Sequence, residues 1–200
     1  MKQGISCLFL ALPLLLASCL GIDADARIGA DGAVDLNLTY TVSTALDELG
    51  KLGANAEYLP VPVGRDDLQL AAQRAGGELR SWSRKDGAES FVVTSALRFP
   101  TAAAFASFID PAGKLASYSE AGGRATLSMT LSEGTPPADK DLIEFIQVAF
   151  SEYAISVRIS VPRNPSASTG FTVTGRNASF SMKAAELFGS PAPVAVSVSW

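Results

Sequence analysis

The sequence contains no histidine and only two cysteines, Cys7 and Cys19. Without histidine it has no Ser-His-Asp or Cys-His nucleophile, and most zinc sites are excluded. The GxSxG, SxxK, GxxxxGK[ST] and GxGxxG motifs of hydrolases and nucleotide-binding proteins are missing as well. We therefore expect no enzymatic activity, no catalytic residue, no metal and no cofactor. A pair of carboxylates is what remains for a hydrolase.

Long apolar runs are also scarce. The run from residue 5 to residue 16 is interrupted only by Pro13 and follows the single charge of Lys2. It is too short to span a hydrocarbon core of ~30 Å, and it is typical of a secretory signal. No later run reaches the length of a membrane-spanning helix.

The signal ends in Leu-Ala-Ser-Cys at residues 16–19, which matches the bacterial lipobox. In a lipobox the cysteine thiol accepts diacylglycerol before the leader is cleaved. We predict a lipoprotein signal peptide over residues 1–18, with Cys19 as the lipid attachment site. The alternative is an ordinary signal peptide in which the cysteine is coincidental, or cleavage after the small residues further on, around Ala24 and Ala26.

Cleavage before Cys19 leaves 182 of the 200 residues and no possible disulfide. We expect one domain over residues 19–200, large enough to be stabilised by its own core. Loss of Lys2 lowers the 16 basic residues to 15 against 20 acidic ones, a mature net charge of −5. Nucleic acid is excluded as a partner because phosphate contacts need concentrated cations.

Alternating apolar and polar residues predict strands with one buried face. Glycine-containing turns, GADG and KDGA, join them into hairpins. The predicted strands are 22–28, 34–42, 79–85, 89–99, 124–131 and 155–161, with shorter pieces at 171–174, 178–182 and 193–200. Phe91, Val93, Leu97 and Phe99 are expected on an inner face. The abundant alanines leave open whether the core is solid or hollow.

Four segments have helical periodicity or caps. They are 44–52, 66–75, 102–109 and 138–152. Because short turns join the strands, we predict an α+β fold in which one largely antiparallel sheet of hairpins packs against three to four helices.

Charged clusters have simple interpretations. Asp23, Asp25, Asp31 and Asp35 lack the glycine and spacing of a calcium loop, so we expect them on the solvated face of the first hairpin. A second cluster places cations beside a tryptophan, which is a pattern that meets anionic headgroups. Its residues are Arg80, Trp82, Arg84 and Lys85. The alternative for this cluster is a solvated hairpin with one partly buried indole.

The mature chain resembles the LppM-type domain of bacterial envelope lipoproteins. The resemblance lies in CLGIDADARI, ADGAVDLNLTYTV, ALRFPTAAAFASFI and ISVRISVPRNP. Members often carry a C-terminal transmembrane helix, and this sequence has none. The resemblance implies an α/β domain that handles lipid, and Cys19 is the one site residue that it carries over.

Three hypotheses for function follow. The first is a non-enzymatic envelope protein that is anchored by N-terminal acyl chains and binds a lipid or amphiphile at the membrane surface. The second is an interaction protein that docks on an envelope complex, and the third is a carboxylate-based hydrolase. Leu20 follows the anchor where retained inner-membrane lipoproteins of enterobacteria have aspartate. In a host with two membranes we expect the periplasmic face of the outer membrane or the cell surface.

Overall fold

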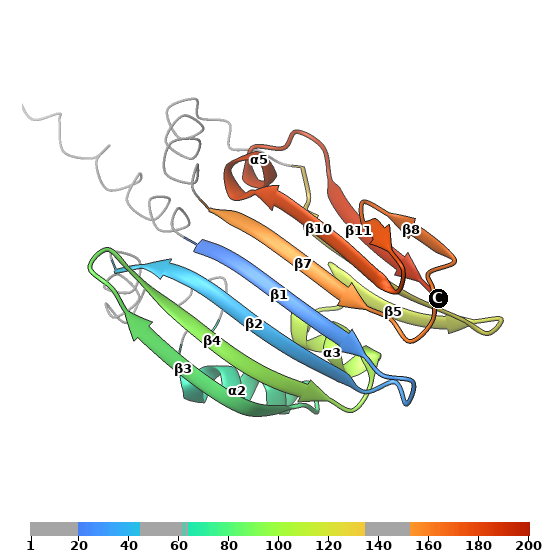
Figure 1. Cartoon of the computed structure of the whole chain (residues 1–200), viewed down its shortest axis with the longest axis horizontal. Coiled ribbons are helices and arrows are strands. Elements are labelled where there is room, and N and C mark those ends of the chain that lie inside the picture. Colours follow the sequence, from blue (N-terminus) through green and yellow to red (C-terminus); the bar gives the residue numbers. More distant parts are fainter. Residues whose placement is uncertain (1–19, 45–61, 63, 135–152) are drawn as a thin grey trace, which may run out of the picture.

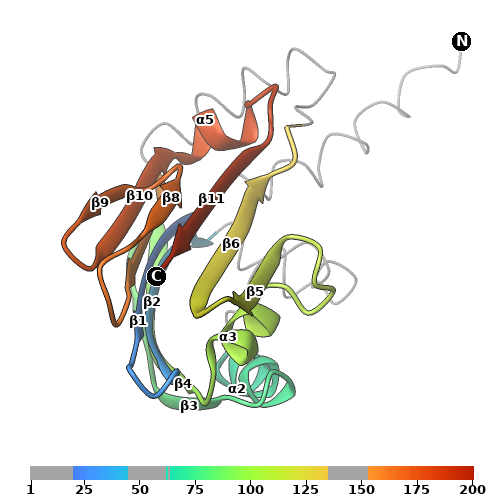
Figure 2. The same ribbon diagram turned by 90° about the vertical axis from the view of Figure 1, so that its right-hand side faces the viewer.

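The structure is a computed structural model that describes residues 20–44, 62, 64–134 and 153–200. The described chain forms two sheets that face each other (Figures 1 and 2). The larger sheet has the order β3-β4-β2-β1-β7-β10-β9, and the smaller has the order β5-β6-β11-β8. The strands are β1 (Leu20–Ile28), β2 (Val34–Ser43), β3 (Glu78–Asp86), β4 (Ser90–Phe99), β5 (Ala116–Ala121), β6 (Arg124–Ser132), β7 (Ala154–Ser160), β8 (Ala167–Thr169), β9 (Thr172–Thr174), β10 (Asn177–Lys183) and β11 (Val194–Ser199).

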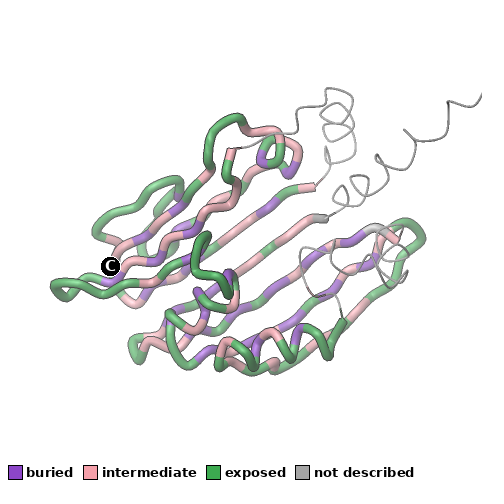
Figure 3. The backbone as a smooth tube through the Cα atoms, turned by 180° about the vertical axis from the view of Figure 1, so that it is seen from behind, coloured by how far each residue is buried: buried purple, intermediate pink, exposed green. Residues whose placement is uncertain are grey.

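Both predicted hairpins are confirmed. β1 pairs antiparallel with β2 through a turn at Gly32, whose φ of 82° suits glycine, and β3 pairs antiparallel with β4. Alternation also places the apolar residues as expected, since Phe91, Val93, Leu97 and Phe99 are all buried. Figure 3 shows buried positions alternating with more exposed ones along these strands.

The predicted fold class is wrong in three respects. The strands form two sheets rather than one, and the larger sheet is mixed because β1 lies parallel to β7. The predicted packing of one sheet against three to four helices is also wrong, because the described residues are mostly strand and a second sheet takes part of that place. The described helices are α2 (Arg65–Arg74), α3 (Ala102–Ile109) and the five-residue α5 (Ala184–Phe188). A parallel pair needs a long crossover, and hairpin turns alone cannot reveal which distant strands meet.

Helices α2 and α3 confirm two of the predicted helices, and they cover the inner face of the larger sheet at its β3-β4 end (Figure 2). The Thr101 side chain caps α3 by accepting a 3.0 Å hydrogen bond from the amide of Ala104. The ring of Phe99 packs against Phe105 and Phe108, with centroids 5.8 and 5.0 Å away. This aromatic cluster fixes α3 against β4.

The smaller sheet covers the other end of the same inner face (Figure 2). Its inner face consists of buried side chains from two strands. They are Ala125, Leu127 and Met129 of β6 and Val196 and Val198 of β11. Strands β5 and β8 and helix α5 were not predicted. The core therefore lies between the inner face of the larger sheet and the layer that α2, α3 and the smaller sheet form over it.

The predicted helices 44–52 and 138–152 fall almost entirely outside the described residues, and Cys19 lies outside them too. Within the described ranges, no helix is both long and apolar enough to cross a membrane.

Candidate functional site

The core contains an apolar cavity of about 400 Å³. It lies between the larger sheet, strand β6 and helices α2 and α3. Its described lining comprises Ile22, Ala24, Ala26, Leu36, Leu38, Pro62, Leu68, Ala71, Phe105, Phe108, Ile109, Pro111, Met129, Leu131, Ile155 and Val157. Every one of these side chains is apolar, and the volume is within the range of small-molecule sites. The described side chains leave an apolar space open at this point of the core.

Small residues explain why the space is not filled. Ala24 and Ala26 of β1 point into the middle of the layer, and Ala71 of α2 faces them from the helical side. On the neighbouring strands the paired positions carry larger residues, since Ala24 pairs with Leu38 on one side and Val157 on the other. A close-packed core normally avoids such voids, because lost contacts cost free energy. The alanines thus form the floor of a preformed cavity.

The cavity opens beside the end of α3. Ile109 is 41% exposed and Pro111 is also exposed, although both line the cavity. The other described lining residues are buried or half-buried. Residues that face both solvent and cavity mark its mouth.

A buried tyrosine holds one wall. The hydroxyl of Tyr40 donates a 2.6 Å hydrogen bond to the backbone carbonyl of Pro62, which lines the cavity. Burial raises the pKa of Tyr40 to about 12, because the phenolate would lose its hydration. Tyr40 therefore stays protonated and acts as a donor.

An aspartate organises the segment at the mouth. The carboxylate of Asp110 accepts hydrogen bonds from the amides of Ala112 at 3.0 Å, Ala116 at 3.2 Å and Leu115. The hydrogen bond from Leu115 is the largest cause that lowers the pKa of Asp110, and the other amides add to it. Gly113, with a φ of 68°, completes the turn by donating to the Asp110 carbonyl. The carboxylate of Asp110 thus accepts backbone hydrogen bonds that fix the conformation of this segment.

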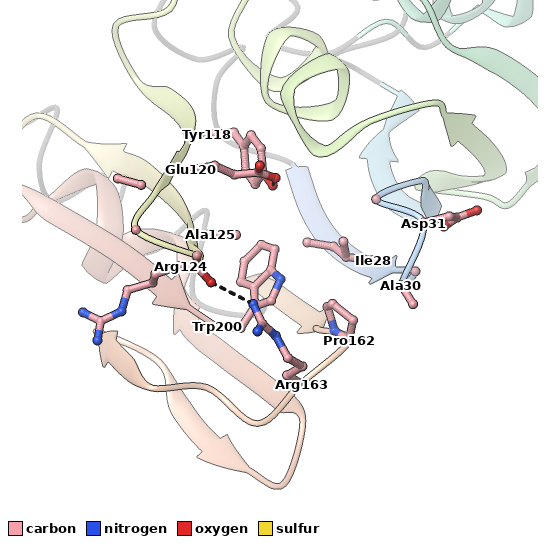
Figure 4. Close-up of a pocket in the computed structure, with 15 residues that line it drawn as sticks. Ile28, Ala30, Asp31, Tyr118, Glu120, Arg124, Ala125, Pro162, Arg163 and Trp200 are labelled. Carbon is pink, nitrogen blue, oxygen red and sulfur yellow. Dashed lines mark hydrogen bonds between the residues drawn. The ribbon is translucent and has the colours of Figure 1, made fainter.

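A second cleft of about 580 Å³, lined by both polar and apolar residues, lies at the other end of the inter-sheet layer (Figure 4). The rings of Tyr118 and Trp200 are 6.2 Å apart within it. Arg163 donates a 3.2 Å hydrogen bond to the carbonyl of Gly123, drawn as a dashed line in Figure 4. The tips of two hairpins form its sides, so it is a groove between turns rather than part of the core.

Two carboxylates, Asp31 and Glu120, line this cleft from different hairpins (Figure 4). Glu120 accepts the hydroxyl of Tyr118, and burial together with that hydrogen bond raises the pKa of Tyr118 to about 12. Asp31 accepts the amide of Ala33 at 3.2 Å. Each carboxylate thus has a local partner, and the hydrolase hypothesis stays a prediction. In the described part of the chain, no cluster of three or more possible metal ligands occurs.

The predicted headgroup cluster is divided between the two faces of edge strand β3. Trp82 and Arg84 pair with the buried Ser95 and Val93 and share their inward face, whereas Lys85 points outward. The Arg84 guanidinium lies 3.7 Å from the ring centre of Phe91 and forms an ion pair of 2.7 Å with Asp86.

Arg80 lies at an irregularity of β3, and it forms an ion pair with Glu78. The indole nitrogen of Trp82 is buried, and no described residue accepts a hydrogen bond from it. The structure therefore brings the four residues together along one strand but not onto one surface. Headgroup contact by these residues stays a prediction.

Asp23, Asp25 and Asp35 of the first hairpin lie on the outer face of the larger sheet, as expected, whereas Asp31 lies in the turn and lines the second cleft. Asp25 forms a 3.0 Å ion pair with Arg158 of β7, and Asp35 forms a 2.8 Å ion pair with Arg98 of β4. These cross-strand pairs link neighbouring strands on a partly solvated face, where each contributes little to stability.

Sequence reasoning did not find the apolar cavity. The abundance of alanine raised the question of a hollow core, and Ala24 and Ala26 in the inward register of β1 were the available signal. Their partners across the layer, Ala71 and Met129, come from elements that are remote in the chain. The predicted lipid attachment site, Cys19, lies outside the described residues.

No protein-family model matches the chain, and no curated protein matches it. Among solved structures it is similar to the NMR structure of the folded domain of the Mycobacterium tuberculosis LppM protein. The identity is 13%, the match covers 90% of this chain and 88% of that chain, and the TM-score is 0.49. That domain is of the type that the sequence resembles.

Proposed function

We propose that the protein is a lipid-anchored, non-enzymatic protein of the bacterial envelope, and that its cavity binds an acyl chain of a lipid or another amphiphile. The observation that carries the proposal is the apolar cavity of about 400 Å³ between the sheets. The lipobox ending at Cys19 supports the anchor, and the missing catalytic motifs agree with a binding role.

The lining defines the part of the ligand that is bound. No charged or polar side chain occurs among the described residues that line the cavity. A buried charge without a partner would be costly, so a headgroup has to stay outside while the hydrocarbon chain enters. We infer a ligand with at least one flexible apolar chain.

The energetics are sufficient for useful affinity. Each buried methylene contributes ~0.8 kcal/mol, so a chain with about ten buried methylenes contributes ~8 kcal/mol. That free energy corresponds to a dissociation constant of about 1 μM before the cost of immobilising the ligand is subtracted. Weak, exchangeable binding is expected, as suits a protein that takes up and releases lipid.

Filling the cavity tests the proposal. A dansyl-labelled fatty acid should bind the full chain with increased fluorescence, and Ala24→Phe should weaken this binding tenfold or more because the new ring occupies the cavity. The control is Ala96→Phe, which adds the same ring on the outward face of β4. Equal binding by both variants would contradict the proposal, provided that both unfold cooperatively.

The alternative of docking on an envelope complex has less support. The exposed edge of β3 carries several charges and an irregularity, which are devices that prevent edge-to-edge strand pairing. Cross-linking in cells that recovers one dominant protein partner would favour this alternative.

A further inference from the structure

We propose that the segment from Ile109 to Leu115, which joins α3 to β5, is the surface through which the protein contacts an anionic lipid bilayer. Lipid would enter the cavity there. This inference rests on the proposed function and adds the route that the ligand takes. We refer to residues 109–115 as the mouth segment.

Apolar exposure is the first observation. Among the described residues, five large apolar side chains are exposed, and two of them lie in the mouth segment: Ile109 and Leu115, each 41% exposed. Pro111 between them is exposed as well. Exposed apolar groups that lie close together mark interaction surfaces, whereas scattered ones need no explanation.

Continuity with the cavity is the second observation. Ile109 and Pro111 belong both to this surface and to the cavity lining. An acyl chain that leaves a bilayer beside Ile109 reaches the cavity without crossing water. A bilayer supplies at this surface the hydrocarbon chains that an apolar cavity accepts, which favours a bilayer as the occupant.

Charge is the third observation. Lys114 is exposed and has no ion pair within the part of the chain that the structure describes. The neighbouring carboxylate of Asp110 is occupied by backbone amides. A cation flanked by apolar side chains complements an anionic interface, where lysine near the surface contributes ~1 kcal/mol. The mature chain is acidic overall, so this contact is local.

The rigidity of the mouth segment makes such a contact efficient. The Asp110 carboxylate and the turn at Gly113 fix the backbone before any membrane is met. Ordering a flexible loop on binding would cost part of the interaction free energy, and this loop is already ordered.

Spin labelling tests the contact directly. The full, processed protein is reconstituted into phosphatidylcholine vesicles that contain phosphatidylglycerol, and a nitroxide is attached to Leu115→Cys. The matched control is Val173→Cys, an exposed apolar residue on β9, and Lys85→Cys reports on the β3 cluster. The unsubstituted protein supplies the background signal.

At Leu115→Cys we expect frequent collisions with oxygen and few with a water-soluble nickel complex. At Val173→Cys we expect the reverse. Nickel accessibility at Leu115→Cys equal to that at Val173→Cys would overturn the inference, and so would burial of that label by another protein in native membranes. Protection at Lys85→Cys alone would place the contact on β3 instead.

A transfer experiment separates this inference from the proposed function. Lys114→Glu combined with Leu115→Gln changes residues that do not line the cavity. Uptake of the dansyl-labelled fatty acid from phosphatidylglycerol-containing vesicles should slow about fivefold or more, with unchanged equilibrium affinity. Unchanged uptake overturns the membrane contact alone. Failure of the unsubstituted protein to bind the probe, with Leu115→Cys still in the bilayer, overturns only the cavity proposal.

Discussion

The hydroxyl of Tyr40 donates a 2.6 Å hydrogen bond to the carbonyl of Pro62 and thereby holds one wall of the apolar cavity. Tyr40 is fully buried. Tyr40→Phe should lower the free energy of unfolding by about 1–2 kcal/mol, because the carbonyl of Pro62 loses its partner. Urea denaturation measures the change, with Tyr118→Phe as a control that removes a more exposed hydroxyl. An unchanged urea midpoint in Tyr40→Phe would show that the bond does not stabilise the fold.

The same residue predicts a dependence on alkaline pH. An ordinary tyrosine in the unfolded chain ionises near pH 10, whereas burial raises the pKa of Tyr40 to about 12. The folded state therefore holds one more proton than the unfolded state between these values, and stability falls as pH rises through that window. Tyr40→Phe should flatten the fall. A variant as sensitive to alkali as the unsubstituted protein would assign the effect to other groups.

Asp110 predicts the opposite dependence, at acidic pH. Its folded pKa is lowered, so its stabilising contribution is present above the ordinary carboxyl value and is lost as pH falls through the folded value. Asp110→Asn should be less stable at neutral pH, because the new amide group meets backbone donors that the carboxylate accepted. It should also lose less stability on acidification. Denaturation across pH measures both effects, and Asp66→Asn, at an exposed position in the first turn of α2, is the control.

Cys19 predicts a covalent modification. Cys19→Ser should abolish labelling of the protein by a palmitate analogue in cells and stop processing by signal peptidase II, because serine has no thiol to acylate. Gel mobility and metabolic labelling report the two steps. Cys7→Ser is the matched control, since that residue lies within the predicted leader. Normal processing of Cys19→Ser would show that the leader is cleaved at another site.

Local pattern was enough to predict the hairpins and two helices. Thr101 and the run that follows it predicted α3 at its observed bounds, because a cap and helical periodicity lie within one short segment. Alternation likewise put Phe91 and Phe99 on the inner face of β4. These features depend on residues that are neighbours in the chain.

The long-range features were beyond such reasoning. Nothing in residues 22–27 or 155–160 states that the two segments lie parallel and adjacent, and that pairing made the larger sheet mixed. Strand β5 has mostly small and polar residues around Tyr118, so its alternation of apolar and polar residues is weak. It forms a strand because it pairs with β6. Treating every strand as part of one sheet also concealed the layer in which the cavity lies.

The candidate site shows the same limit. The apolar character of Ile22 or Met129 is evident in the sequence, but their common cavity depends on how β1, β6, α2 and α3 meet. The predicted headgroup cluster was recognised by the spacing of its residues alone. The pairing of β3 with β4 places Arg84 and Lys85 on opposite faces of the sheet. Residue composition can suggest that a binding surface exists, whereas the pairing of the strands decides which side chains lie on the same face.

Native mass spectrometry of the protein extracted from its own membrane tests the central claim most directly. We predict the mass of the acylated chain plus one further lipid that is not covalently bound and is released at higher collision energy. Ala24→Phe should lack this lipid, and Ala96→Phe should retain it. The acylated chain alone in the unsubstituted protein, or a lipid retained equally by Ala24→Phe, would contradict the claim that the cavity binds an acyl chain.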